Sequence, residues 1–335
     1  MLKGARRIWM LALVPNHRHG RLISAVVILL LGTSVYALAD YLRSLPSASN
    51  RGFLSWSVAM FFVTAVAYIV PVFHYISQRT RQSLYQLAPY LPQSTDIDAL
   101  TTEVERRTVG WTFRVTLVAV ALWLIQSRLL AGSWLLMWER TLGGFVNIAM
   151  DWGPLPVWLT MCTSMSALVH NALLFRRLVR QLDVRILEPE SFMPVGTMAV
   201  TSTLVVLGAL ALLSVMWLGG PLSWWTTLPA LAFFSPLIAM LLLLPVLPLH
   251  RRLREQRLAA IQAAQAEVTR VHAPDAGASV AERAAALSLR REVARLPAWP
   301  FDVPAIIRFI SYAVIVPLTW AGAALIEILV NAIVA

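Results

Sequence analysis

Seven apolar stretches of the chain are each close to the length that an α-helix needs to cross a lipid bilayer, about 20 residues. They lie at residues 22 to 42, 53 to 77, 111 to 132, 155 to 175, 198 to 218, 222 to 249 and 304 to 331. The stretches are continuously apolar and do not alternate in polarity, which argues against a membrane β-barrel. The sequence therefore predicts an all-α, multi-pass integral membrane bundle of about seven transmembrane helices.

The composition agrees with this class of protein. The 335 residues are 58% hydrophobic and 13% charged. A soluble fold of that composition would have too little polar surface to cover its exterior. The formal net charge is +11, and the basic residues lie beside the apolar spans. This placement favours anionic lipid headgroups as their partners and argues against nucleic acid.

The distribution of charge predicts the orientation of the bundle. With the N-terminus in the cytoplasm, the inner segments hold 24 basic and 13 acidic residues, whereas the outer segments hold four of each. Basic residues are retained on the cytoplasmic side of membrane proteins. We therefore expect the N-terminus to be cytoplasmic and the C-terminus to lie outside, in a bacterial-type cell inner membrane.

Two inner segments precede the third span. Residues 1 to 21 combine basic clusters with a short apolar run from Ile8 to Val14, which predicts an uncleaved segment lying on the inner leaflet. Residues 94 to 110 contain a helix start at Asp96 and no Gly or Pro before Gly110. This pattern predicts that the third span extends as one helix about 20 Å into the cytoplasm.

Residues 250 to 303 predict a cytoplasmic helical hairpin that precedes the last transmembrane segment, 304 to 335. The sixth span can continue as a helix to His272, and the following Pro and Gly residues favour a turn. Ser279 and Glu282 then form a capping box for a second helix. Apolar residues recur at helical spacing on both arms, at Ile261, Ala264, Val268 and Val271, and at Ala286, Leu289, Val293 and Leu296.

No signature of a soluble enzyme is present. The sequence contains no phosphate-binding glycine loop, no paired-histidine zinc motif and no nucleophile elbow. Cys162 is the only cysteine, so an intramolecular disulfide is impossible. We expect a non-enzymatic protein without a metal or cofactor, although an intramembrane enzyme of an unfamiliar kind remains an alternative.

Charged residues near membrane depth are the first group of candidate functional residues. Asp40, Arg128 and Glu327 fall near the outer ends of spans one, three and seven. Charge is costly in hydrocarbon and usually has a partner or a hydrated cavity. These three residues could line the outer mouth of a pathway, or they could simply lie hydrated at the interface.

Polar residues inside the spans are the second group. Thr163, Ser166 and His170 follow helical spacing on span four, where they could line water or hydrogen-bond neighbouring helices. His74 and His170 could form a proton-sensitive pair near the inner face. Prolines in spans six and seven favour central positions for these helices, which would place Trp320 and Glu327 beside an internal cavity.

These features favour a homo-oligomeric channel or sensor whose hairpin supplies the subunit contacts. The predicted topology is similar to that of the seven-span insect chemosensory receptor channels, a resemblance of topology without a shared motif. A secondary transporter, with Asp40, Arg128 and the polar face of span four as its substrate site, is the second hypothesis. A membrane scaffold whose hairpin docks a cytoplasmic partner is the third.

Overall fold

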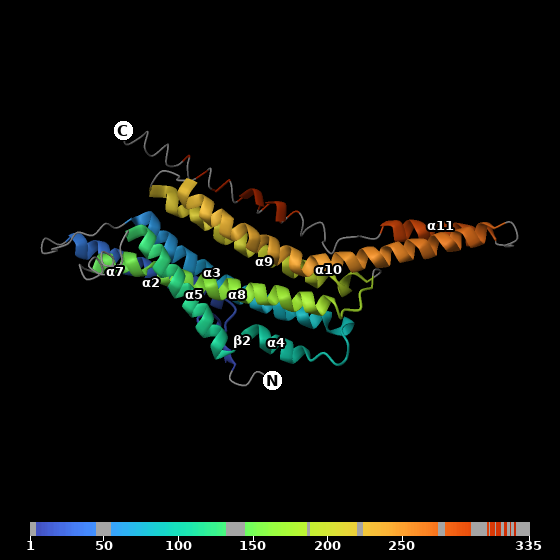
Figure 1. The fold of residues 1–335 in the computed structure, drawn as a ribbon, viewed down its shortest axis with the longest axis horizontal. Helices are drawn as coiled ribbons and strands as arrows, with labels where there is room; N and C mark the ends of the chain where they lie inside the picture. Colours follow the sequence, from blue (N-terminus) through green and yellow to red (C-terminus); the bar gives the residue numbers. More distant parts are fainter. Residues whose placement is uncertain are drawn as a thin grey trace.

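A computed structural model of the protein describes residues 5–44, 55–131, 145–185, 188–219, 224–273, 279–295 and single positions between 307 and 325. Within these residues, six helices are long and apolar enough to cross a membrane. They form a bundle from which a two-helix arm extends (Figure 1). The predicted class, an all-α multi-pass bundle, is confirmed.

Each of the first six predicted spans coincides with a helix. The helices are α2 (Gly20–Ser44), α3 (Trp56–Leu87), α5 (Val109–Ala131), α8 (Pro154–Val179), α9 (Met193–Ala211) and α10 (Trp224–His272). The other elements are β1 (Arg6–Arg7), α1 (Trp9–Ala12), η1 (Ala88–Tyr90), α4 (Ile97–Glu105), β2 (Arg106–Arg107), α7 (Phe145–Trp152), η2 (Pro189–Ser191), η3 (Leu212–Gly219) and α11 (Val280–Arg295). The predicted seventh span is described only at single positions, so it stays a prediction.

The largest apolar cluster is formed by α3, α8, α9 and α10. Its fully buried side chains include Leu84 of α3, Val179 of α8, Val195 of α9 and Leu249 of α10. Helix α3 is central to the bundle because it also packs against α1, α2 and α4. Close packing between helices holds a membrane bundle together, because apolar side chains gain no hydrophobic free energy by moving from lipid into the bundle.

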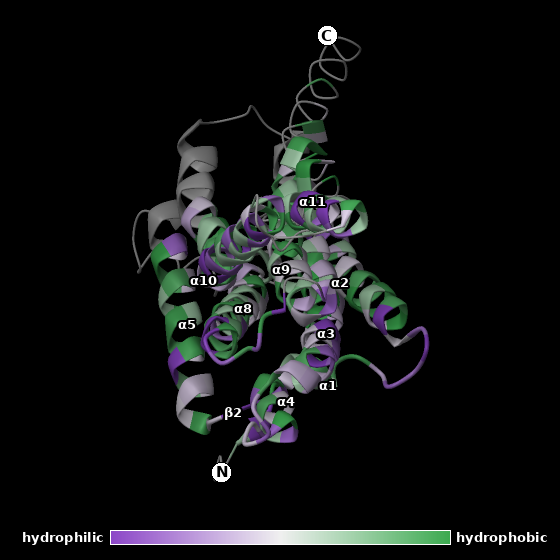
Figure 2. Cartoon of the chain, turned by 90° about the vertical axis from the view of Figure 1, so that its right-hand side faces the viewer, coloured by the Kyte–Doolittle hydropathy of each residue, from purple (hydrophilic) through white to green (hydrophobic). Residues whose placement is uncertain are grey.

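Helices α2 and α5 turn long apolar surfaces away from the bundle. Leu22, Leu30 and Leu31 of α2 are exposed, as are Phe113 and Leu117 of α5. Figure 2 shows α5 at the edge of the bundle with hydrophobic residues along most of its length. In water such patches would drive association, whereas in a bilayer lipid chains cover them.

The apolar run from Ile8 to Val14 packs against the bundle, while its predicted position on the inner leaflet stays a prediction. Ile8, Met10 and Leu11 are buried against α3 and α8, whereas Trp9 and Leu13 are exposed. The Ser164 hydroxyl of α8 lies 3.8 Å from the Met10 sulfur. Strand β1, which directly precedes the run, pairs antiparallel with β2, and the Ile8 amide donates to the Glu105 carbonyl at 3.0 Å. The N-terminal segment is therefore part of the packed bundle.

The predicted helical extension over residues 94 to 110 is wrong in its continuity. Asp96 does cap a helix, accepting a hydrogen bond from the Ala99 amide at 3.0 Å. That helix, α4, ends at Glu105, and Arg106–Arg107 form strand β2 before α5 begins. Pairing with β1 competes with helix here, an interaction between segments about 100 residues apart. Helix α4 consequently packs back against α3 and does not prolong α5.

Two glycines show how closely the helices approach one another. A Cβ atom placed on Gly208 of α9 would overlap the hydroxyl of Tyr68 on α3. That hydroxyl donates a hydrogen bond to the Val205 carbonyl at 3.2 Å. Gly32 of α2 similarly faces the side chain of Val63 on α3. Small residues at such contacts let helix backbones come close in a membrane.

We expect Gly208→Ala to destabilise the protein, because the added methyl group must displace Tyr68 from its hydrogen bond. The free energy of unfolding should fall by about 1–3 kcal/mol, the usual cost of overpacking. Thermal unfolding in detergent measures this change. Gly110→Ala is the matched control, since nothing lies within 4 Å of its added Cβ. Equal stability of the two variants would contradict the close approach of α3 and α9.

Candidate functional site

Helix α10 makes a set of polar contacts with the end of α8 at the point where α10 leaves the bundle. The Arg252 guanidinium donates to three backbone carbonyls at the end of α8: Val179 at 2.8 Å, Arg180 at 2.6 Å and Leu182 at 3.2 Å. The last carbonyls of a helix have no partner inside it, and a cation there also complements the helix dipole. Arg252 therefore fixes α10 to the end of α8.

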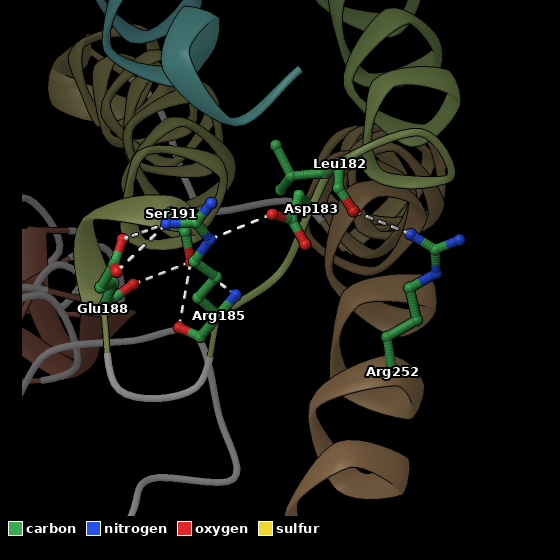
Figure 3. A network of polar contacts seen from close by, with 6 residues as sticks. All are labelled: Leu182, Asp183, Arg185, Glu188, Ser191 and Arg252. Atoms are coloured by element: carbon green, nitrogen blue, oxygen red, sulfur yellow. Dashed lines mark hydrogen bonds and ion pairs between the residues drawn. The ribbon is translucent and has the colours of Figure 1, made fainter. Parts of the chain in front are cut away.

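The chain after α8 forms a compact turn beside this contact (Figure 3). Arg185 donates to the Asp183 carboxylate at 3.0 Å and to the Glu188 carboxylate at 3.3 Å. The fully buried Ser191 hydroxyl donates to the Glu188 carbonyl at 2.7 Å and accepts from the Arg185 amide at 3.1 Å. The hydrogen bonds that Arg185 donates to the Asp183 and Glu188 carboxylates raise the pKa of Arg185 above its ordinary value. The turn is thus held by side chains that bind backbone as well as one another.

This turn is also fixed to α3. The Asp183 amide donates to the carbonyl of Tyr90, in the 3₁₀ turn η1 that follows α3, at 2.8 Å. The Arg185 guanidinium lies 6.0 Å from the centre of the Tyr90 ring, a cation–π distance. Helices α3, α8 and α10 are therefore connected by one polar network at this end of the bundle, which we call the junction and define by Tyr90, Asp183, Arg185, Glu188, Ser191 and Arg252.

Beyond the junction, α10 continues as one arm of a helical hairpin. It runs unbroken from Trp224 to His272, and α11 packs against its distal half (Figure 1). The buried seam consists of Ala264, Val271, Ala286 and Val293. The Arg257 guanidinium adds a hydrogen bond to the Ala294 carbonyl at 2.6 Å. The two predicted helical arms are confirmed, and residues 274–278 between them lie outside the described residues.

The predicted capping box at the start of α11 is also confirmed. The Glu282 amide donates to the Ser279 hydroxyl at 3.2 Å, and the Ser279 amide donates to the Glu282 carboxylate at 2.8 Å. The latter bond lowers the pKa of Glu282. Reciprocal bonds of this kind satisfy amides that have no partner within the helix. The second arm of the hairpin therefore has a defined start.

The candidate charges at membrane depth have different outcomes. Asp40 accepts a hydrogen bond from Arg43, one turn further along α2, at 2.7 Å and another from the Trp56 indole of α3 at 3.3 Å. Its described contacts therefore join α2 to α3 and do not extend to the polar face of α8. The Arg128 side chain, Trp320 and Glu327 lie outside the described residues.

The polar face of span four makes contacts within its own helix and with α4. The buried Thr163 hydroxyl donates to the Leu159 carbonyl at 2.7 Å, one turn earlier in α8. Ser166 is partly exposed on the same helix. His170 lies 2.8 Å from the Glu103 carboxylate of α4. That contact joins two elements which the sequence pattern did not connect.

The two candidate histidines do not contact each other in the described structure. His170 has Glu103 as its partner, whereas Nδ1 of His74 is buried without a hydrogen-bond partner among the described residues. The charges nearest to His74 come from Arg21, Arg7 and Glu105. The two rings therefore belong to different local environments at the same end of the bundle.

A small cavity lies among α3, α8 and α9. Its volume is about 30 Å³, and its lining is apolar apart from Tyr68 and Ser164. Such a volume accommodates about one water molecule and is far below the several hundred Å³ typical of small-molecule sites. This cavity gives no support to a substrate site inside the bundle.

Fold and junction together define a helical multi-pass membrane-type protein with a helical arm joined to its core. The chain matches no protein family, no curated protein and no solved structure in the comparisons made with it. Its function must therefore be argued from its own residues.

Sequence reasoning missed the roles of Arg252 and Glu103. Arg252 stands in a run of four arginines, of which Arg251, Arg254 and Arg257 have the same sequence signature. Only the packing of α8 against α10 distinguishes it. For Glu103, the only signal for a contact with His170 was that an acidic residue lies on a predicted helix and a histidine lies on a predicted span. That signal does not identify which acidic residue contacts which histidine, because a single sequence does not show which helices are neighbours.

We expect Arg252→Gln to weaken the junction. Loss of a guanidinium that bonds three carbonyls should lower the free energy of unfolding by about 2 kcal/mol. It should also speed amide hydrogen exchange over residues 176–185. Arg254→Gln, which removes the same charge from an exposed position two residues away, is the control and should change neither. If both variants change stability and hydrogen exchange by the same amount, Arg252 contributes only its charge and the junction does not depend on its hydrogen bonds.

Proposed function

We propose that this protein is a non-enzymatic, homo-oligomeric membrane channel or sensor whose α10–α11 hairpin holds the subunits together. In this proposal the hairpin is cytoplasmic, as the charge distribution predicts. The last predicted span, 304 to 331, follows the hairpin in the chain and lines a path between subunits. The junction couples movement of the hairpin to the bundle through α8.

The placement of the last predicted span supports this proposal most directly. Most of its described apolar positions are exposed on the single chain, namely Ile307, Ile310, Val314, Ile315, Leu318 and Leu325, whereas Phe309 packs against the main apolar cluster. The cavity among α3, α8 and α9 holds about one water molecule, so it provides no path through the centre of the subunit. A path that uses residues of this span therefore fits between subunits better than inside one.

The hairpin supplies a second argument. Leu258 and Leu289 are 50% and 48% exposed, on arms that extend beyond the other helices (Figure 1). The seam between the arms uses mainly alanine and valine, and a pair of helices of this kind buries little apolar surface. Association with further copies would cover the exposed leucines, as core positions do in helical bundles.

The other two hypotheses have weaker support. A transporter with Asp40, Arg128 and the polar face of span four as its site needs these groups to converge, whereas Asp40 bonds Arg43 and Trp56. A scaffold would present the same exposed leucines to a different protein. Self-association of the full chain distinguishes a scaffold from the proposed assembly.

The first test measures the oligomeric state of the full-length protein in detergent by native mass spectrometry. We expect a defined oligomer for the wild type. In Leu258→Glu and Leu289→Glu, self-association should weaken roughly tenfold per leucine, because each loses a buried apolar contact. Gln262→Glu, at an exposed polar position on the same arm, should assemble normally. A wild type that stays monomeric at all concentrations would refute the assembly.

The second test measures cation flux through vesicles that contain the purified protein. If Glu327 lies at the outer mouth of the path, Glu327→Gln should reduce cation flux roughly tenfold, since acidic groups at a mouth concentrate cations. Glu292→Gln, at an exposed position of α11, is the control and should conduct normally. An oligomer that assembles but never conducts would refute the channel hypothesis and leave the sensor hypothesis in place.

A further inference from the structure

A ribbon of four arginines lies where two membrane-spanning helices begin. Arg6 pairs with Arg107, and Arg7 pairs with Arg106, in the antiparallel ribbon of β1 and β2. Helix α5 starts two residues after the ribbon, at Val109. Arg21, in the first turn of α2, and Arg7 of the ribbon both lie near His74 of α3. The start of an apolar span marks the level of the lipid headgroups, so the ribbon is placed at that level.

Arg107 differs from the other three arginines in its burial. Arg6, Arg7 and Arg106 are exposed, whereas Arg107 is 5% exposed. One of its terminal nitrogens donates to the Glu103 carbonyl, and its guanidinium lies 5.6 Å from the centre of the Trp111 ring. Its Nε and other terminal nitrogen are buried and have no hydrogen-bond partner among the described residues. A buried guanidinium edge with two free donors is costly unless an acceptor binds it.

The charge of Arg107 is not matched by an ion pair among the described residues, since the Glu103 carboxylate bonds His170 and the Glu105 carboxylate lies 3.6 Å from Arg81. Burial lowers the pKa of Arg107 to about 10, opposed by the nearby Glu103 charge. The guanidinium therefore stays positively charged at neutral pH.

The surface beside Arg107 is apolar and faces away from the bundle. On the first turns of α5, Val109 and Phe113 are exposed, Phe113 to 67%, and the space around Gly110 is open within 4 Å. Lipid chains could lie along this face while a headgroup meets the arginines. Because Arg107 is only 5% exposed, entry of a ligand requires local movement of the residues around it.

We propose that the β1–β2 ribbon binds a phosphate group, with Arg107 as its buried donor, and that an anionic phospholipid headgroup supplies this phosphate. Guanidinium recognises phosphate through two parallel N–H bonds, which matches the two unpartnered donors of Arg107. The exposed arginines of the ribbon provide further positive charge at the surface. An anionic lipid also brings acyl chains for the exposed face of α5, which free phosphate does not.

The test uses the full-length protein in detergent and measures thermal stabilisation on adding three probes separately. The probes are phosphatidylglycerol, phosphatidylcholine and inorganic phosphate. We expect phosphatidylglycerol to raise the Tm strongly and phosphatidylcholine to raise it little. Arg107→Gln should weaken the apparent affinity for phosphatidylglycerol at least roughly tenfold, because it loses charge-assisted bonds. Arg114→Gln, which removes an exposed charge from the next turn of α5, should bind it like the wild type.

A second variant, Arg107→Lys, keeps the test informative if Arg107→Gln does not fold. Lysine retains the charge but cannot make two parallel bonds, so phosphatidylglycerol should bind this variant more weakly than it binds the wild type. Equal responses to both lipids, or equal losses in the Arg107 and Arg114 variants, would overturn the proposal. If inorganic phosphate alone stabilises the protein as much as phosphatidylglycerol does, in a way that depends on Arg107, that result would overturn the lipid as the source of the phosphate and support free phosphate as the ligand.

Discussion

Peptide groups in the hydrocarbon core of a bilayer have no water to bond, so each crossing segment must satisfy its own backbone. That constraint explains why six long helices account for most of the described chain and why irregular structure gathers at their ends. It also explains the position of the polar contacts. The Arg252 guanidinium and the Ser191 hydroxyl both bond backbone groups at helix ends or in the turn that follows, where carbonyls and amides lack helical partners.

The two ends of α10 have different surroundings. Its first half packs in the bundle, where Leu241 and Leu249 are buried, and its second half pairs with α11. One continuous helix therefore joins a membrane core to a helical arm without a loop between them. The Arg252 contact holds this helix to α8 at the boundary. Such a connection is rigid enough to transmit movement, which a sensor or a gated channel requires, although a scaffold could use it as well.

Helix positions followed from apolar length and from capping residues, both of which act locally. The six spans, the capping box at Ser279 and the Asp96 cap were predictable for that reason. The β1–β2 ribbon was not, because Arg6–Arg7 and Arg106–Arg107 have no strand signal of their own and form strands only through each other. Burial of Met10 and the His170–Glu103 contact were hidden for the same reason: each depends on which helices are neighbours.

The sequence by itself determined the class of the protein, the positions of six of its helices and the two helical arms, because hydrophobic length and helix capping are properties of adjacent residues. Tertiary structure alone decided which of many similar arginines carry specific contacts. Arg252 reaches the α8 carbonyls, and Arg107 is buried with two donors that have no partner in the described part of the chain, while Arg254 and Arg106, close by in sequence, remain exposed. Their environments differ because helix packing, and not residue type, sets the burial and the partners of a charged side chain.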